Sequence, residues 1–274
     1  MKLEYTLNDN KNGLVVTDGK DLEGELVIPS EDCLGGKIYP VIAIGEEAFC
    51  ACSALTSIVI PDSVIEIGKW AFSGCSGLTS IVIPDSVIEI GKWAFSGCSG
   101  LTSIIVDKEN RHYDSREGCN AIIESKTNTL VVGCPTTVIP DSVPKIGDGA
   151  FENCSASTSI VIPDSVIEIG NYAFRGCKGL TSIVIPDSVT KIGNYAFSGC
   201  SGLTSIVIPN SVTEIGNWVF YGCSGLTSIV IPDSVIEIGN RAFCGCSGLT
   251  SIVISDASLL KGTVIFKGVE IVKP

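Results

Sequence analysis

The fold is decided by residues 78–100, which read LTSIVIPDSVIEIGKWAFSGCSG. Residues 55–77 are identical to them, and close variants begin at Leu180, Leu203 and Leu226. A repeat of this length is typical of solenoids, in which each repeat is one structural unit stacked on its neighbours. The chain is therefore built from one repeated unit, here called a coil.

The first half of a coil has the alternating pattern of a β-strand. Ile81 and Ile83 alternate with Ser80 and Val82, which predicts a strand whose two isoleucines face the core. Pro84 has no amide proton and ends the strand.

The second half of a coil returns the chain to the core. Gly91 allows a bend, and residues 92–98 are expected to form a short helical turn that buries Ala94, Phe95 and Cys98. One coil has an apolar face with nothing to cover it, so it cannot fold alone. Stacking coils about 4.8 Å apart buries these faces and predicts a parallel-stranded solenoid.

The core phenylalanines give the register of the coils. They recur once per coil at a constant interval, except between Phe95 and Phe151, where a longer gap marks an insertion. The full set is Phe49, Phe72, Phe95, Phe151, Phe174, Phe197, Phe220 and Phe243.

The Ile-Pro-x-x-Val, Ile-Gly-x-x-Ala-Phe and final Cys elements resemble the BspA-type leucine-rich repeat of bacterial surface proteins. The resemblance covers most of the chain. It implies a curved solenoid. Together with the strands and turns predicted from the residues, the expected fold is an α/β solenoid with a parallel β-sheet, short helical turns on the other side and a cap at each end. The resemblance also implies a secreted or surface-attached protein, and for some members binding of extracellular matrix or other cells.

The breaks in the repeat predict the organisation of the chain. Residues 1–54 are expected to form an N-terminal cap with the first half-repeat, residues 55–254 the solenoid, and residues 255–274 closing strands. Residues 107–134 are predicted to be an inserted loop and hairpin. This insertion carries His112 and is interpreted either as a projecting recognition element or as a hairpin that packs on the solenoid edge.

The charge of the chain excludes some partners. It has 30 acidic and 18 basic residues, a formal net charge of −12. Nucleic acid requires a basic footprint, and anionic lipid repels such a chain, so neither is expected as a partner. No apolar run reaches the roughly 20 residues that span a bilayer. Residues 1–6 lack a signal-peptide core, which leaves the cytoplasm open beside the surface location.

Thirteen cysteines occur in the chain, and most of them share one repeat position. That position predicts a ladder of free core thiols, because cysteine is a small, readily buried residue. A straight ladder does not give the converging geometry of a zinc site. Cys119 and Cys134 bracket the predicted hairpin and are the candidate disulfide.

The residue after the proline is almost always aspartate. Stacked carboxylates about 5 Å apart repel by about 0.8 kcal/mol even in water. Calcium ions could relieve this repulsion, but the favoured interpretation is an exposed turn residue that accepts backbone amide bonds. No metal and no cofactor is therefore predicted.

The outward positions of the predicted strands form a candidate binding surface. A valine at this position recurs along the solenoid and predicts an exposed apolar row, which is typical of interaction sites. The candidate residues are Val59, Val82, Val161, Val184, Val207, Val230 and Val253, with Ser80, Ser182 and Ser205 beside them.

An aromatic position is the second candidate surface. Exposed aromatic rings would suit sugar or protein recognition. The alternative is that they cover the outside of the core between coils. The residues are Trp70, Trp93, Tyr172, Tyr195 and Trp218.

No catalytic constellation is visible in the sequence. There is one histidine, and near-identical coils do not bring unlike groups to one point. The sequence therefore predicts a monomeric, non-catalytic binding module for a protein or glycan. A structural spacer that presents another domain is the alternative, and an enzyme that uses His112 is the third hypothesis.

Overall fold

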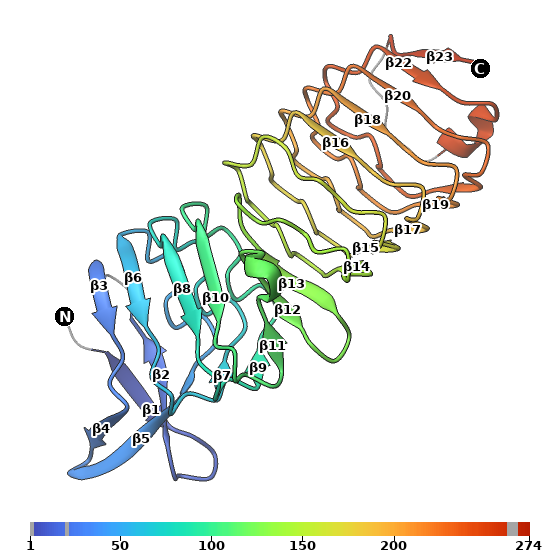
Figure 1. Cartoon of the computed structure of the whole chain (residues 1–274). Helices are drawn as coiled ribbons and strands as arrows, with labels where there is room; N and C mark the ends of the chain where they lie inside the picture. The colour runs from blue at the N-terminus through green and yellow to red at the C-terminus, as the bar shows by residue number, and fades with distance from the viewer. Residues whose placement is uncertain (1–2, 20–21, 262–267) are drawn as a thin grey trace. The chain divides into compact units, whose positions relative to one another are not determined.

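The computed structural model describes residues 3–19, 22–261 and 268–274. The chain forms two compact units. The first unit comprises Met1–Thr127 with Val132–Thr136, and the second comprises Asn128–Val131 with Thr137–Pro274. In each unit the strands of successive coils lie side by side (Figure 1).

The first unit contains two main sheets. One has the order β10-β8-β6-β3 and is parallel, with strands β3 (Gly24–Val27), β6 (Leu55–Val59), β8 (Ser80–Ile83) and β10 (Ser103–Val106). The other has the order β1-β2-β5-β7-β9, with β1 (Glu4–Leu7), β2 (Leu14–Asp18), β5 (Lys37–Ile44), β7 (Glu66–Ile67) and β9 (Glu89–Ile90), and β4 (Glu31–Leu34) pairs antiparallel with β5.

The second unit also contains two parallel ladders. One has the order β16-β18-β20-β22-β23, with β16 (Ser182–Val184), β18 (Ser205–Val207), β20 (Ser228–Val230), β22 (Ser251–Val253) and β23 (Glu270–Val272). The other joins the short strands β14 (Lys145–Ile146), β15 (Glu168–Ile169), β17 (Lys191–Ile192), β19 (Glu214–Ile215) and β21 (Glu237–Ile238).

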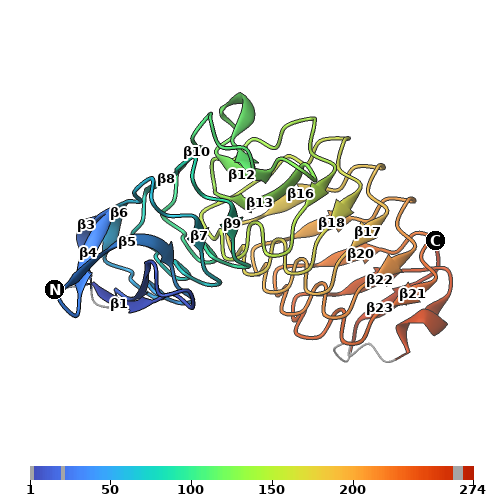
Figure 2. The same ribbon diagram turned by 90° about the horizontal axis from the view of Figure 1, so that it is seen from below.

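The pairing register equals the sequence period. Ser182 pairs with Ser205, and Ile169 pairs with Ile192, so each residue meets the equivalent position of the next coil. Equivalent positions of successive coils therefore lie next to one another, and the stacked parallel coils are seen from a second direction in Figure 2. The predicted parallel leucine-rich-repeat solenoid is confirmed.

Stacked apolar columns form the core of each unit. The rings of Phe174 and Phe197 stack with centroids 5.3 Å apart and planes 6° apart, and Phe49 and Phe72 stack in the first unit at 5.2 Å. The two core-facing isoleucines of the repeated Ser-Ile-Val-Ile strand are buried, as Ile81 and Ile83 show. Stacking of the phenylalanine rings removes apolar surface of every coil from water.

The predicted helical turns are wrong. Over residues 92–98 the amides of Ala94, Ser96 and Cys98 bond to carbonyls three residues back. The carbonyls of Lys92, Ala94 and Ser96 instead accept amides of the preceding coil, for example Phe72 N at 2.7 Å from Ala94 O. The segment is a row of turns that are hydrogen-bonded between coils.

The backbone explains why no helix forms there. Trp93 and Gly97 have φ values of +57° and +74°, and a left-handed residue cannot continue a right-handed helix. The described residues hold two short 3₁₀ helices, η1 (Arg116–Gly118) and η2 (Ala257–Leu260), and neither lies at this repeat position.

The first half of the insertion packs on the first unit. Asn110 is buried, and its side-chain amide donates to Pro84 O at 2.7 Å and to Val87 O at 3.0 Å. The Tyr113 hydroxyl accepts the Ile90 amide at 2.9 Å. These bonds replace those that another coil would supply, so this part of the insertion is anchored rather than projecting.

The rest of the insertion supplies three strands. They are β11 (Tyr113–Asp114), β12 (Ala121–Glu124) and β13 (Thr129–Gly133), with β11 antiparallel to β12. Thr129 and Leu130 begin the short-strand ladder of the second unit by pairing with β14.

The chain ends contribute strands to the same ladders. Val27 pairs with Val59 in the first unit, and Val272 pairs with Val253 in the second. Part of the closing segment expected within residues 255–274, residues 262–267, lies outside the described residues. The expectation that both ends act as caps stays a prediction.

Candidate binding surface

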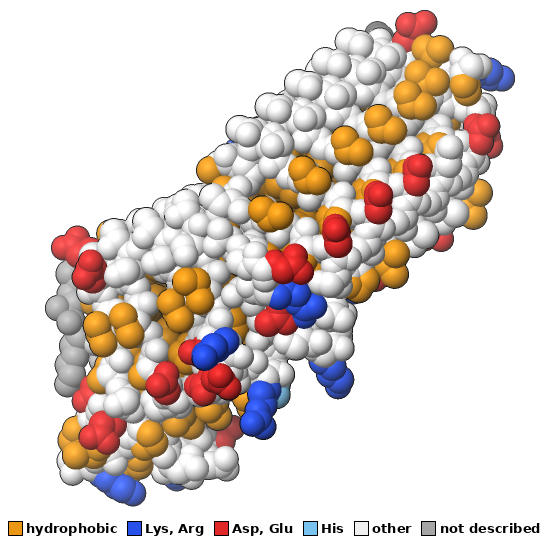
Figure 3. Space-filling model, in the orientation of Figure 1, with side chains coloured by type: hydrophobic (Ala, Val, Ile, Leu, Met, Phe, Trp, Pro, Cys, Tyr) orange, Lys and Arg blue, Asp and Glu red, His pale blue; other side chains and the backbone are white. Residues whose placement is uncertain are grey.

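The valine position forms an exposed row on the second unit. Val161, Val184, Val207 and Val230 have relative exposures of 81%, 75%, 67% and 53%, and Val253 is half-buried. In Figure 3 a row of hydrophobic side chains crosses the strands of this unit, with acidic side chains beside it. The row is continuous because each strand turns the same residue outward at the same register.

The first unit carries a shorter row of the same kind. Val59 and Val82 are 55% and 50% exposed. Several residues of these two rows were not predicted from the sequence, because they lie where the repeat is interrupted or where its residues are substituted. These are Val27 and Ile105 in the first unit, and Val138 and Val272 in the second.

Small polar residues lie beside the valine row. Ser80 is half-buried, whereas Ser182 and Ser205 are exposed. The preceding threonines fix the strand ends to one another, for example through Thr204 Oγ1, which donates to Thr181 O at 3.2 Å.

The aspartate column borders the row on its other side. Asp164, Asp187 and Asp233 are exposed, and Asn210 interrupts the column. The hydrogen bond that ties each turn to the preceding coil comes from the next residue, as Ser188 Oγ donates to Val166 O at 2.7 Å. The serines thus bind each turn to the coil before it, whereas the aspartates were expected to accept backbone amide bonds within the turn, and their exposure is as predicted.

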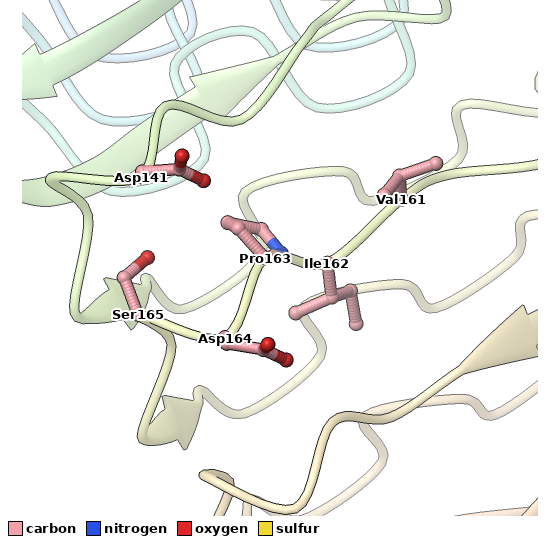
Figure 4. A pocket seen from close by; sticks show the side chains of 6 residues that line it. All are labelled: Asp141, Val161, Ile162, Pro163, Asp164 and Ser165. Carbon is pink, nitrogen blue, oxygen red and sulfur yellow. The ribbon is translucent and has the colours of Figure 1, made fainter.

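Two shallow hollows lie between the valine and aspartate positions of the second unit. One is lined by Val161, Pro163, Asp164 and Ser165 with Asp141 of the preceding coil, as Figure 4 shows. The other spans two coils and is lined by Val207, Pro209, Val230 and Pro232 with flanking Asp187, Asn210 and Asp233. Each hollow has an apolar floor and an acidic border.

A second exposed apolar column was also missed. It consists of Ile65 and Ile88 in the first unit and of Ile167 and Ile236 in the second, at 42%, 51%, 52% and 71% exposure. Thr190 and Thr213 interrupt it. The strand pattern Val-Ile-Glu-Ile could have revealed this column, because it places one isoleucine outward next to a short strand.

The aromatic candidates are stacked on one another. Tyr172 and Tyr195 lie 4.8 Å apart and Tyr195 and Trp218 5.7 Å apart, nearly parallel in both cases. The guanidinium of Arg241 lies 4.8 Å from the Trp218 ring. Trp70 and Trp93 stack at 5.7 Å in the first unit. Sugar recognition uses open ring faces, and these faces are occupied by neighbouring rings and cations.

The aromatic column occupies a strained backbone position. Tyr172, Tyr195 and Trp218 have φ values of +58°, +58° and +59°. A left-handed conformation costs a residue with a Cβ atom roughly 1–2 kcal/mol. Ring stacking offsets this cost, which favours a structural role for the column.

An asparagine ladder precedes the aromatic column in the second unit. Asn194 N donates to Asn171 Oδ1 at 2.8 Å, and Asn217 N donates to Asn194 Oδ1 at 2.7 Å. Asp148 begins the ladder by accepting the Asn171 amide at 2.9 Å. The signal in the sequence was the constant Gly-Asn pair, which replaces the Gly-Lys pair of the first unit.

The cysteine column is buried in both units. The thiols of Cys75, Cys98, Cys177, Cys200, Cys223 and Cys246 donate to a main-chain carbonyl of the preceding coil, as Cys200 Sγ does to Phe174 O at 3.1 Å. Burial raises the pKa of Cys200 and Cys223 well above its ordinary value. Such thiols are poorly reactive.

Cys119 and Cys134 are both buried thiols in the structure. Cys134 Sγ donates to Asn120 O at 3.4 Å, and burial raises the pKa of Cys119. Each sulfur is directed to a nearby carbonyl, and the disulfide suggested by the sequence stays a prediction that counting of thiols can test.

The short strands of the second unit carry a charge triad. Lys145 Nζ and Lys191 Nζ lie 3.2 Å and 3.0 Å from Glu168 Oε1. Burial opposes ionisation of Glu168, but the hydrogen bonds from Lys191 and Lys145 lower its pKa below the usual value. The triad pairs opposite charges within this ladder, whereas the aspartate column of the second unit contains no lysine or arginine.

Within residues 3–19, 22–261 and 268–274, no three His, Cys, Asp or Glu side chains gather in a way that could hold a metal ion. No helix in this part of the chain is long and apolar enough to cross a bilayer. His112 is exposed at the surface of the insertion.

Comparisons with solved structures return other bacterial repeat proteins. A leucine-rich repeat protein from Bacteroides ovatus is 29% identical, with a TM-score of 0.56 over 100% of this chain and 77% of that one. One from Eubacterium ventriosum is 21% identical, with a TM-score of 0.59 over 92% and 82%. A leucine rich cell surface protein from Faecalibacterium prausnitzii is 24% identical, with a TM-score of 0.47 over 98% and 92%.

No curated protein matches the sequence. The model of the BspA type leucine rich repeat region matches residues 40–130 and 132–250 in six copies, which is well over half of the chain. The coils, their register and this match agree, and the chain belongs to the BspA type leucine-rich repeat family.

Proposed function

We propose that the chain is a non-catalytic binding module that recognises a protein through the valine row of its second unit. The exposure of Val161, Val184 and Val207 carries the proposal, because contiguous exposed apolar side chains are unfavourable in water unless a partner covers them. The hollows beside the row supply shape for such a partner.

The valine row is favoured over the other surfaces for physical reasons. The isoleucine column is interrupted by Thr190 and Thr213. The aromatic rings are engaged in stacking with each other and with Arg241. A protein ligand is therefore preferred to a glycan.

A location at the bacterial surface or outside the cell is part of the proposal. It rests on membership of the family and on the location that the resemblance implies. Protease treatment of intact cells of the bacterium that produces the protein tests this location. Digestion of the chain without cell lysis is the expected result, and full protection would contradict the location.

The binding proposal is tested by paired substitutions on two exposed columns. The chain, labelled with a fluorophore, is applied to immobilised basement-membrane extract and to intact epithelial and bacterial cells. We expect Val161→Ser with Val184→Ser to reduce binding about tenfold, since each removes a buried aliphatic contact. Ile167→Ser with Ile236→Ser removes similar apolar surface elsewhere and is the matched control.

Two outcomes would contradict the proposal. If the valine pair binds as the unmodified chain does, the valine row is not the contact surface. If the unmodified chain binds none of the three targets while the surface location holds, the structural-spacer hypothesis is favoured instead.

A further inference from the structure

The border of the valine row carries negative charge and no positive charge. Residues 159–165, 182–188 and 228–234, which carry the row and the turn after it, contain one aspartate each, residues 205–211 have Asn210 in its place, and none of the four segments contains lysine or arginine. Asp141, Asp164, Asp187 and Asp233 are exposed along this border.

The carboxylates and the apolar floor occur together in each hollow. Asp141 and Asp164 come from successive coils and flank the hollow that contains Val161 and Pro163 (Figure 4). Asp187 and Asp233 flank the hollow that contains Val207 and Val230. A single group that enters such a hollow meets both an aliphatic surface and carboxylates from different coils.

We propose that the valine row binds a basic polypeptide segment, with lysine or arginine side chains seated between the valine and aspartate columns. The inference rests on the proposed function and names the chemistry of its partner. A long basic side chain lays its aliphatic stem on apolar surface and keeps its charge at the border, which is what each hollow offers. A cation between two stacked carboxylates also relieves their mutual repulsion.

A second copy of the chain fits this surface poorly. An interface between two valine rows would join two chains that each have a net charge of −12. Like charges in an interface disfavour association. The same charge attracts a basic partner and speeds its approach at low salt.

The test uses the full chain and three labelled synthetic peptides. One alternates lysine with valine, the second has acetyl-lysine in place of lysine, and the third has glutamate. Fluorescence anisotropy is expected to show tight binding of the lysine peptide, weakening as salt is raised, and at least tenfold weaker binding of the other two.

Charge-matched variants separate a specific contact from general attraction. Asp164→Asn with Asp187→Asn is expected to weaken binding of the lysine peptide about three- to tenfold. Glu214→Gln with Glu237→Gln removes the same charge from exposed residues of the short-strand ladder and is expected to change binding less than twofold.

The outcomes separate this inference from the proposed function. Equal weakening by both charge pairs, or undiminished binding of the acetylated peptide, overturns the basic-partner inference. If the aspartate pair has no effect on binding to cells or matrix while Val161→Ser with Val184→Ser abolishes it, the proposed function stands and the partner is not basic. If the valine pair also has no effect, both fail.

Discussion

At the scale of single residues, the aromatic column shows that local backbone preference is overridden by contacts between coils. Tyr195 adopts a φ of +58° and stacks on Tyr172 and Trp218. Sequence reasoning found the column, since its spacing is plain, but not its backbone. The left-handed conformation is set by hydrogen bonds to the next coil, which a single coil does not reveal.

Tyr195 variants test this account of strain. We expect Tyr195→Ala to be less stable than Tyr195→Gly by about 1 kcal/mol, because alanine keeps the strained Cβ atom without the ring. Both should be less stable than the unmodified chain, since ring stacking is lost. Urea unfolding followed by circular dichroism measures the difference.

Thr190 is the control for the glycine effect. It is exposed and is not among the left-handed residues. Thr190→Gly should therefore be less stable than Thr190→Ala by about 0.5–1 kcal/mol, the reverse of the order at Tyr195. The same order at both sites would contradict the strain argument.

Ser157 replaces the core leucine at the start of the second unit. Its hydroxyl is buried without a hydrogen-bond partner in the structure. We expect Ser157→Ala to raise the free energy of unfolding by about 1 kcal/mol, because an unsatisfied buried hydroxyl is costly.

Chemical denaturation compares this variant with Ser188→Ala, which removes a hydrogen bond to Val166 O and should lower stability by a similar amount. Destabilisation by both variants would show that the Ser157 hydroxyl is satisfied in solution.

At the scale of elements, the strand in the first half of each coil was predicted correctly, and the helical turn predicted for the second half was wrong. The strands follow from alternation, and the proline end of Pro84 was read correctly. Residues 92–98 were expected to form a helical turn after the bend at Gly91, with Ala94, Phe95 and Cys98 buried. In the structure their amides and carbonyls bond between coils, and this non-local pairing gives the same burial pattern without a helix.

The charge triad makes a prediction about pH. The pKa of Glu168 is lowered in the folded chain, so its stabilising effect is complete above the pKa of the unfolded chain, about 4.3, and is lost as the pH falls through the lower folded value. The unmodified chain should therefore lose more stability between pH 7 and pH 3 than Glu168→Gln does.

Urea midpoints at the two pH values measure this difference. Glu237→Gln, at an exposed residue of the same ladder, should follow the unmodified chain. Parallel losses in all three chains would show that Lys145 and Lys191 do not stabilise the carboxylate.

At the scale of the whole molecule, the repeat and the insertion predicted the solenoid but not its division into two compact units. The anchoring role of Asn110 and Tyr113 was also missed. Neither residue belongs to the repeat, and their partners in the preceding coils are known only when the chain has folded. The sequence predicted most valines of the candidate binding surface. It did not predict that the aspartates form the border of that surface, because they were interpreted only as turn residues.

Thiol reactivity tests the arrangement of cysteines across the chain. Cys33 is exposed, Cys50 and Cys244 are half-buried, and the other ten are buried. We expect one thiol to react rapidly with a disulfide reagent in the native state, two more slowly, and all 13 after denaturation. A total below 13 in denaturant would reveal a disulfide.

The identity of residues 55–77 and 78–100 has a consequence for how the surface can change in size. If one such coil is gained or lost, the neighbouring coils still stack on a coil with the same residues. The packing of the core therefore does not favour a particular number of coils. Each added coil brings one valine and one aspartate in register. Affinity for a long partner can then be adjusted by valency, through the number of coils, without altering any single contact.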